Sequence, residues 1–288
     1  MIKWLVFIGV ILVLCIAEWM REIFSFKITH YDILSDKLNN LKKEETIVFL
    51  TDLHNNSYGK QNEKLLDAVK RQKPDLILIG GDMLVGKPKT PTKVAEDFVC
   101  KLSEICPVIY ANGNHEQRMK IYPERFGTKY QEYKSRLEKS GILFLENEHT
   151  DWMMDDCRAR ITGLEIPREG YRKFHQTSVS LEQIEECIGK LDSSRYQILM
   201  AHNPTYMETY LEWGADLVLS GHFHGGVVRI PGLGGVITPQ FQLFPKYSGE
   251  LTQKDGKFAV VSKGLGTHTI KIRFLNPAEV VVLHLKGK

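Results

Sequence analysis

The most constraining feature of this 288-residue chain is a set of five short apolar segments that each lead directly into a polar turn. Short runs of β-branched and leucine residues bounded by polar turns are typical of buried strands. The carboxyl ends of strands in an open α/β sheet form its ligand-binding edge, so we expect the five turns to converge. The segments with their turns are IVFL-TDLH (47–54), LILI-GGD (76–82), VIYA-NGNHE (108–116), ILMA-H (198–202) and LVLS-GHFH (217–224).

Five of the ten histidines lie in these turns. A single histidine is more often a packing residue than a ligand, but five at strand ends point to a shared role. Neutral imidazole combined with carboxylate and amide oxygen suits manganese, iron, zinc or cobalt and does not suit calcium. The sequence therefore predicts a transition-metal centre, with candidate residues Asp52, His54, Asp82, Asn114, His115, His202, His222 and His224.

The ligand supply is large enough for two ions, because it comprises two carboxylates, one amide and four histidines. In two-metal hydrolases the ions lie about 3.5–4 Å apart, and one carboxylate can bridge them. Asp82 is our candidate bridge. It is central in the series and follows Gly80 and Gly81, which permit a close approach of the backbone.

The ordered series D-x-H, GGD, GNHE, H and GHFH resembles the calcineurin-like binuclear metallophosphoesterase superfamily over about residues 46–285. Within it, the chain looks most like the YkuE-type membrane-associated bacterial phosphoesterases, because GHFHGG leads through PGLGG (231–235) to FPKY (244–247) and SKGLG (262–266). The resemblance implies an α/β fold, a four-layer αββα sandwich. It also implies that Asp52, His54, Asp82 and His224 surround one ion, and that Asp82, Asn114, His202 and His222 surround the other.

The resemblance implies hydrolysis of a phosphate ester or pyrophosphate by a hydroxide activated between two divalent ions. Manganese is expected first, with iron, zinc or cobalt as alternatives. His115 matches the family's histidine that is not a ligand. His115 and Asp82 are our candidate catalytic residues, and His115 would serve as the acid or the electrostatic stabiliser for the leaving group. Two alternatives stay open: a lipid-linked nucleotide pyrophosphatase of the UDP-diacylglucosamine type, and a non-catalytic membrane-tethered binding module. The complete ligand set favours an enzyme.

The chain departs from the family's Ser/Thr protein phosphatases after Asp82. Those enzymes carry an aspartate followed by Arg-Gly where this chain has Val85, Gly86 and Lys87. A protein phosphatase is therefore not expected. The departure leaves two questions open: which group holds His115, and whether Lys87, Arg118 or a backbone amide binds the phosphate.

The amino-terminal segment differs from the rest, because Trp4–Ala17 is an uncharged apolar run. We expect residues 1–24 to be an uncleaved single-pass membrane anchor and residues 45–288 to form the metallophosphoesterase domain. A removed signal peptide and a buried core helix are the alternatives. A charged start before an apolar run resembles an export signal, so the domain is expected outside the cytoplasm. The long aromatic-rich stretch from 225 to 254 slightly favours a substrate near the membrane.

Composition narrows the classes of partner. The net charge of +3 is spread without a basic block, which argues against nucleic-acid binding. The five cysteines contain no CxxC pair, which excludes zinc fingers and thioredoxin-type chemistry. We expect a phosphorylated small-molecule or lipid-linked substrate and a membrane as partners, and no obligate protein partner.

Further strands are expected at 142–145, 160–163, 258–262 and 280–285, and helices at 63–71, 92–105, 130–140, 181–191 and 204–213.

Overall fold

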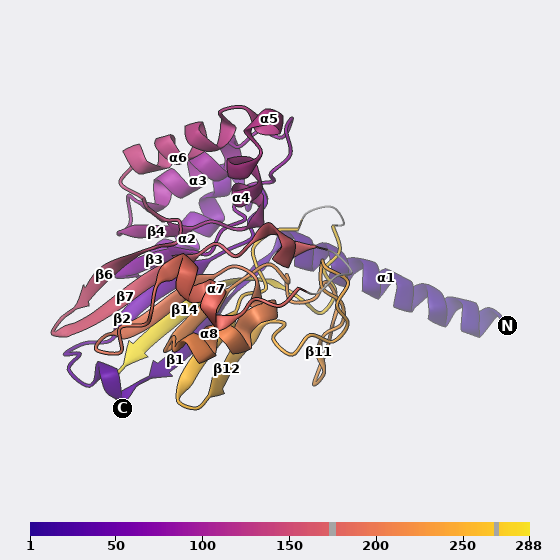
Figure 1. The fold of residues 1–288 in the computed structure, drawn as a ribbon. Helices are drawn as coiled ribbons and strands as arrows, with labels where there is room; N and C mark the ends of the chain where they lie inside the picture. Colours follow the sequence, from indigo (N-terminus) through magenta and orange to yellow (C-terminus); the bar gives the residue numbers. More distant parts are fainter. Residues whose placement is uncertain (173–176, 268–270) are drawn as a thin grey trace.

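Two packed six-stranded sheets with helices on both outer faces form the body of the computed structural model (Figure 1). The structure describes residues 1–172, 177–267 and 271–288, so the predicted domain range of 45–288 includes the two short stretches outside this description. The first sheet has the order β1-β14-β2-β3-β4-β5, and the second has the order β12-β13-β9-β8-β7-β6. The predicted four-layer α/β sandwich is confirmed.

The first sheet places three of the polar turns side by side. Strands β2, β3, β4 and β5 are parallel neighbours, while β14 runs antiparallel to β2 and parallel to β1. The turns after β2, β3 and β4 therefore leave at one edge. The strands are β1 (Phe26–Leu34), β2 (Glu45–Leu50), β3 (Leu76–Ile79), β4 (Val108–Ala111), β5 (Leu143–Leu145) and β14 (Ala278–Lys286).

The second sheet supplies the two remaining turns. Strands β7, β8, β9 and β13 are parallel, and the edge strands β6 and β12 are antiparallel to their neighbours. The strands are β6 (Glu148–Met154), β7 (Cys157–Leu164), β8 (Tyr196–Ala201), β9 (Leu217–Ser220), β12 (Glu250–Lys254) and β13 (Lys257–Val261). A small antiparallel ribbon of β10 (Arg229–Ile230) and β11 (Gly234–Gly235) lies in the long stretch after β9.

Three apolar layers hold the sandwich together. One lies between the sheets, one between the first sheet and its helices, and one between the second sheet and α7 and α8. In α2, Leu65, Ala68 and Val69 are buried, which is the spacing of one helix face. The helices are α2 (Glu63–Arg71), α3 (Lys93–Leu102), α4 (Asn114–Ile121), α5 (Pro123–Phe126), α6 (Lys129–Lys139), α7 (Leu181–Ile188) and α8 (Met207–Trp213), with 3-10 turns η1 (Asp36–Leu38), η2 (Lys60–Asn62), η3 (Arg168–Tyr171) and η4 (Pro204–Tyr206).

The elements that the sequence did not predict lack a continuous apolar run. Strands β1, β6 and β12 lie at sheet edges and carry many exposed polar side chains. Helix α4 starts inside the GNHE turn and has no clear apolar face. Strand β1 pairs with β14 along its full length, so the first sheet begins at Phe26, ahead of the expected domain start at residue 45.

Helix α1 (Ile2–Phe24) is longer than the uncharged run within it. In the described part of the chain, it is the helix that is long and apolar enough to cross a membrane, and its most apolar stretch is not buried. Its 23 residues extend about 35 Å, against a hydrocarbon thickness of about 30 Å. The last turn contacts the body. The Trp19 indole Nε1 donates to the Lys271 carbonyl at 2.8 Å, and Glu22 is 1% exposed.

Candidate metal centre

The structure brings seven of the eight predicted side chains together where strands β2, β3, β4, β8 and β9 end. Histidine and carboxylate atoms form three overlapping groups, each spanning no more than 4.8 Å, and all their members are buried. Asn114 and His115 begin α4 directly after β4. The groups are Asp52 with His54 and His224, Asp82 with His202 and His222, and His54 with Asp82 and His115.

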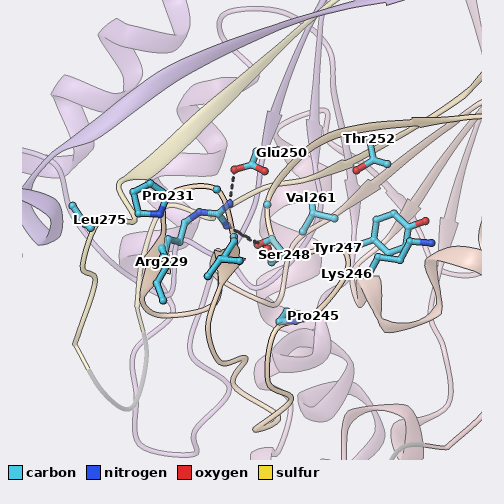
Figure 2. Close-up of a pocket in the computed structure, with 15 residues that line it drawn as sticks. Arg229, Pro231, Pro245, Lys246, Tyr247, Ser248, Glu250, Thr252, Val261 and Leu275 are labelled. Carbon is cyan, nitrogen blue, oxygen red and sulfur yellow. Dashed lines mark hydrogen bonds and ion pairs between the residues drawn. The ribbon is translucent and has the colours of Figure 1, made fainter.

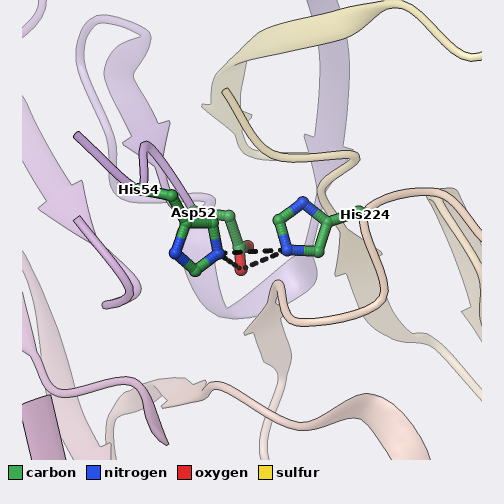
Figure 3. Close-up of side chains that lie close together, drawn as sticks. All are labelled: Asp52, His54 and His224. Carbon is green, nitrogen blue, oxygen red and sulfur yellow. Dashed lines mark hydrogen bonds and ion pairs between the residues drawn. The ribbon is translucent and has the colours of Figure 1, made fainter. Parts of the chain in front are cut away.

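Two histidine rings face one oxygen of Asp52 (Figure 3). The Nε2 atoms of His224 and His54 lie 3.4 Å and 3.6 Å from Asp52 Oδ1. The same two nitrogens are 3.1 Å apart. Three donor atoms of ligand type thus point at one small volume.

One oxygen of Asp82 faces three histidine rings. Its Oδ2 atom is 3.2 Å from His202 Nε2, 3.8 Å from His54 Nε2 and 3.9 Å from His115 Nε2. Asp82 belongs to two of the three groups and lies between them.

The opposite carboxylate oxygens are held by hydrogen bonds. Asp52 Oδ2 accepts from the backbone amide of His222 at 3.0 Å and from the Thr51 hydroxyl at 2.9 Å. Asp82 Oδ1 accepts from the backbone amide of His115 at 2.8 Å. These bonds fix each carboxylate with its other oxygen directed at the histidines.

The turns that carry the site are strained. Asp52, His54, Asp82, His222 and His224 all have φ between 48° and 65°, in the left-handed region that non-glycine residues seldom adopt. Glycines allow the close packing: a Cβ on Gly113 would lie 2.3 Å from Asp82 Oδ1, and a Cβ on Gly221 would lie 2.2 Å from Asp52 Oδ2. The backbone is shaped to present the ligand atoms.

Backbone carbonyls orient two of the histidine rings. His202 Nδ1 donates to the Gly80 carbonyl at 2.7 Å, and His224 Nδ1 donates to the Gly266 carbonyl at 2.9 Å. In the neutral ring this places the lone pair on Nε2, the atom that faces the carboxylates. Both tautomers are therefore those of a metal ligand.

His115 has the opposite orientation. The backbone amide of Gly86 donates to His115 Nδ1 at 2.7 Å. Because an amide can only donate, the proton of the neutral ring lies on Nε2, which faces Asp82. The group that holds His115 is thus the backbone amide of Gly86.

Glu116 is a structural residue of the site to which the sequence assigned no role. It is fully buried, and its carboxylate accepts from the backbone amides of Asp82, Met83 and Gly113. The Tyr110 hydroxyl also donates to it at 2.7 Å. Burial, and next the charge of Asp82, raises the pKa of Glu116 to about 7. Glu116 ties the turns after β3 and β4 together, and its place in the GNHE motif is the only sequence signal of that role.

Arg273 supports the other side of the centre. Its fully buried guanidinium donates to the carbonyls of Lys263, Gly264 and Gly266. Gly266 is the residue whose carbonyl orients His224. No motif in the sequence indicates this contact.

Two arginines lie beside His115 and Asn114. Arg118 donates to the Gly86 carbonyl, and Arg168 Nη1 donates to the Asn114 carbonyl at 2.8 Å. Burial, and next the positive charge of Arg168, lowers the pKa of Arg118. The ring of Tyr171 packs 5.2 Å from that of His222, and the Arg168 guanidinium lies 5.5 Å from the Tyr171 ring centre. Of the three candidates for phosphate binding, Arg118 thus contacts Gly86, whose amide binds His115.

The electrostatics favour ionised carboxylates. Burial raises the pKa of Asp52, but His224 and His202 lower it more, so it lies well below its usual range. Burial also raises the pKa of Asp82, but His202 and His115 lower it more, so the pKa of Asp82 lies well below its usual range. Burial lowers the pKa of His202, but Asp82 and Asp52 raise it to about 9.

The donor atoms fit divalent transition metals. Asp52 Oδ1 and Asn114 Oδ1 are buried oxygens with no hydrogen-bond donor, which is costly unless a cation is bound. Two donor atoms bound to one ion at about 2.1 Å lie up to about 4.2 Å apart. The donor atoms of each group lie within 4.8 Å of one another, which is close to this distance. The mixture of imidazole, carboxylate and amide donors is that of transition-metal sites.

We expect metal binding to release protons. In the metal-free protein His202 keeps its proton until the pH approaches about 9, whereas a ligand must be neutral. Affinity for Mn²⁺ should therefore rise as the pH increases from neutral towards about 9. Calorimetry at neutral pH in two buffers of different ionisation enthalpy measures the protons released. A heat independent of the buffer would contradict this expectation.

Comparison with known proteins identifies the family. The profile of the calcineurin-like phosphoesterase family matches residues 45–226, and the chain belongs to this family. It is 28% identical over 269 residues to an uncharacterized metallophosphoesterase of Aquifex aeolicus (strain VF5), covering 93% of this chain and 94% of that protein. It is 26% identical to the uncharacterized metallophosphoesterase YkuE of Bacillus subtilis (strain 168), covering 84% and 79%. The predicted family is confirmed.

A solved structure shares the fold. Phosphopantetheinyl hydrolase (PptH) from Mycobacterium tuberculosis aligns with a TM-score of 0.50 and 16% identity, over 78% of this chain and 92% of that one. At this identity the likeness describes the fold alone.

Proposed function

We propose that this chain is a binuclear metal-dependent phosphohydrolase. In this proposal Asp52, His54, Asp82 and His224 hold one ion, and the second ion is held by Asp82, Asn114, His202 and His222. The observation that carries the proposal is the position of Asp82, whose Oδ2 atom lies 3.8 Å from Nε2 of His54 in the first ligand set and 3.2 Å from Nε2 of His202 in the second. A carboxylate shared in this way suits two adjacent cations.

The chain's own residues would orient the substrate and stabilise the departing oxygen. Two bound ions would activate water and neutralise charge on the phosphate. Asp82 and Asp52 supply negative charge to the cations, and the strained turns fix where that charge lies. His115 carries its proton on Nε2, facing the centre, and would donate a hydrogen bond to the negative charge that develops on the departing oxygen. The ring keeps this proton, because a neutral imidazole that lost it would become an imidazolate, and the departing oxygen takes its proton from water.

Arg118 and Arg168 are proposed to bind the phosphate. Arg118 donates to the backbone carbonyl of Gly86, and Arg168 donates to the backbone carbonyl of Asn114. Arg118 Nε is buried without a hydrogen-bond partner. Guanidinium groups bind phosphate oxygens with two parallel hydrogen bonds, which would replace the arginine missing after Asp82.

Removing either guanidinium should weaken substrate use. A hydrogen bond to a charged group contributes about 1.5–3 kcal/mol, so Arg118→Ala and Arg168→Ala should each lower kcat/KM by about 10- to 100-fold. Metal content should stay at the parent level. Arg172→Ala is the matched control, because its side chain is 64% exposed and lies at the end of the same segment. A parent-like kcat/KM in both variants would reject this assignment.

A substrate panel tests the proposed function. The full chain, purified in detergent and reconstituted with Mn²⁺, is assayed on p-nitrophenyl phosphate, bis-p-nitrophenyl phosphate and a UDP-diacylglucosamine-type pyrophosphate. We expect hydrolysis of at least one, loss with a chelator and recovery on re-addition of Mn²⁺. Iron, zinc and cobalt are compared in the same assay. Protein that holds both ions and hydrolyses none of the three would favour the binding-module alternative.

We also propose that α1 anchors the protein in a membrane, with the body outside the cytoplasm. The apolar, unburied part of α1 and its export-like start support this placement. Cleavage of the body by a protease added to intact cells tests the side. Protection in intact cells together with cleavage after lysis would reverse the orientation.

Truncation separates the anchor from the folded body. Removing residues 1–17 keeps Trp19 and Glu22, so the product should be soluble and hydrolyse soluble esters at the parent rate. Removing residues 1–24 also deletes the Glu22 carboxylate that accepts the backbone amide of Asn276 at 2.8 Å. That product should lose about 1 kcal/mol or more of unfolding free energy, measured by denaturant titration. Equal stability of the two truncated proteins would contradict the role of Glu22.

A further inference from the structure

Exposed apolar side chains gather on one part of the body. Between residues 25 and 229 such side chains occur singly or as a pair, as scattered exposed residues usually do. The pairs are Ile28 with Leu34 on β1 and Ile121 with Tyr122, and the single residues are Val94, Leu143 and Met153. After residue 229 they are concentrated in the stretches 230–244 and 272–275. We call six of them the apolar rim; they are 41% to 68% exposed and comprise Ile230, Leu233, Leu243, Phe244, Ile272 and Leu275.

Backbone contacts join these two stretches. Arg229 donates its amide to the Phe274 carbonyl at 3.1 Å, and Val228 pairs with Phe274. The amide of Phe244 donates to the Val236 carbonyl at 3.0 Å, and that of Val236 donates to the Val228 carbonyl at 2.9 Å. Leu233 and Leu275 also line one cavity of about 370 Å³, which Figure 2 shows around Arg229. These contacts place the two stretches side by side, so the rim residues lie on one part of the body.

Helix α1 leaves the body beside this surface (Figure 1). The hydrogen bond from Trp19 ends on Lys271, the neighbour of Ile272, and Glu22 accepts the amide of Asn276, the neighbour of Leu275. Both contacts lie near the carboxyl end of α1. A bilayer crossed by the apolar part of α1 would thus end close to the rim.

The rim is also close to the metal centre. Asn276 Nδ2 donates to the His224 carbonyl at 2.6 Å. On the other side, the Gln240 side chain donates to the Gly170 carbonyl at 3.1 Å, next to Tyr171, whose ring packs on His222. Short hydrogen-bonded links therefore connect α1, the rim and the ligand turns.

We propose that the apolar rim is a second membrane contact, inserted into the head-group region of the lipid bilayer that α1 crosses. Apolar side chains at an interface are buried about 5–10 Å into the boundary between head groups and acyl chains. The contact holds the metal centre at the bilayer surface, so its substrate is an amphiphilic phosphate ester whose phosphate lies at head-group level. This inference rests on the proposed anchor and the proposed hydrolase.

Fluorescence quenching in nanodiscs tests the contact. Leu233→Trp and Leu243→Trp are introduced separately into the full chain, and two positions are used in case one disturbs folding. Each protein is placed in phosphatidylethanolamine/phosphatidylglycerol nanodiscs with plain or brominated acyl chains. Met153→Trp is the matched control, because Met153 is 55% exposed but lies on β6, at the other edge of the second sheet from β12.

We expect bromine to reduce the emission added by Leu233→Trp and Leu243→Trp by about twofold, and to leave that added by Met153→Trp unchanged. Emission that bromine does not quench at either rim position would overturn the proposal. Emission that is shielded from water to the same degree in plain and brominated discs would also overturn it, because it would mean that a second copy of the chain covers the rim. A chain that does not enter nanodiscs would reject the anchor and the rim together. Hydrolysis of the three substrates of the panel is measured in the same discs, so absence of activity on all three would reject the hydrolase separately.

Discussion

Asp82→Asn is expected to lower kcat/KM at least about a thousandfold, since shared charge stabilisation of several kcal/mol is lost. Asp82 Oδ2 faces rings of both ligand groups, at 3.2 Å from His202 and 3.8 Å from His54. An amide supplies less charge to both ions, so metal occupancy should fall at both positions. Steady-state kinetics and elemental analysis of the same preparation measure the two effects.

The control for this variant is Asp151→Asn, which makes the same change in charge at an exposed carboxylate. It should keep parent-like activity and metal content. Circular dichroism should remain native for Asp82→Asn, because the amide oxygen can still accept the backbone amide of His115. Full occupancy at both positions in Asp82→Asn would contradict a bridging role.

His115→Ala is expected to keep both metals and lose rate. A hydrogen-bond donor aimed at a developing oxyanion contributes about 10²- to 10³-fold. The loss should be largest for phenyl phosphate, a poor leaving group, and smaller for p-nitrophenyl phosphate, whose departing oxygen needs no proton. This pattern follows from the Gly86 amide on Nδ1, which leaves the proton on the Nε2 atom that faces Asp82.

The leaving-group dependence separates a histidine that stabilises the departing oxygen from a structural one. His149→Ala, at an exposed position, serves as the control and should match the parent on both esters. A merely orienting His115 would lower both rates by one factor. Loss of metal to the extent seen in Asp82→Asn would instead make His115 a ligand.

The convergence of the site was predictable because it depends on strand direction alone. Apolar runs such as Leu76–Ile79 identify buried strands, and parallel pairing brings the turns that follow them to one edge. Ligand chemistry could then be assigned from residue type. The same argument could not find β1, because an edge strand with exposed polar side chains has no buried run.

The supporting contacts could not be predicted, because each depends on a backbone group or on distant residues. The Gly86 amide that binds His115 has no side chain to signal it. Arg273 orients carbonyls of a loop that no motif connects to it. Glu22 contacts the amide of Asn276, which is 254 positions away in the chain, and its sequence context indicated only the end of an apolar anchor. Tertiary packing decided all three.

The most direct test of the central claim is the metal content of the folded chain. The protein is stripped with a chelator, reconstituted with excess Mn²⁺ and freed of unbound metal. Metal is then measured by plasma mass spectrometry against protein from amino-acid analysis, with circular dichroism as the check on folding. The binuclear centre predicts two ions per chain. One ion or fewer in a natively folded protein would contradict it.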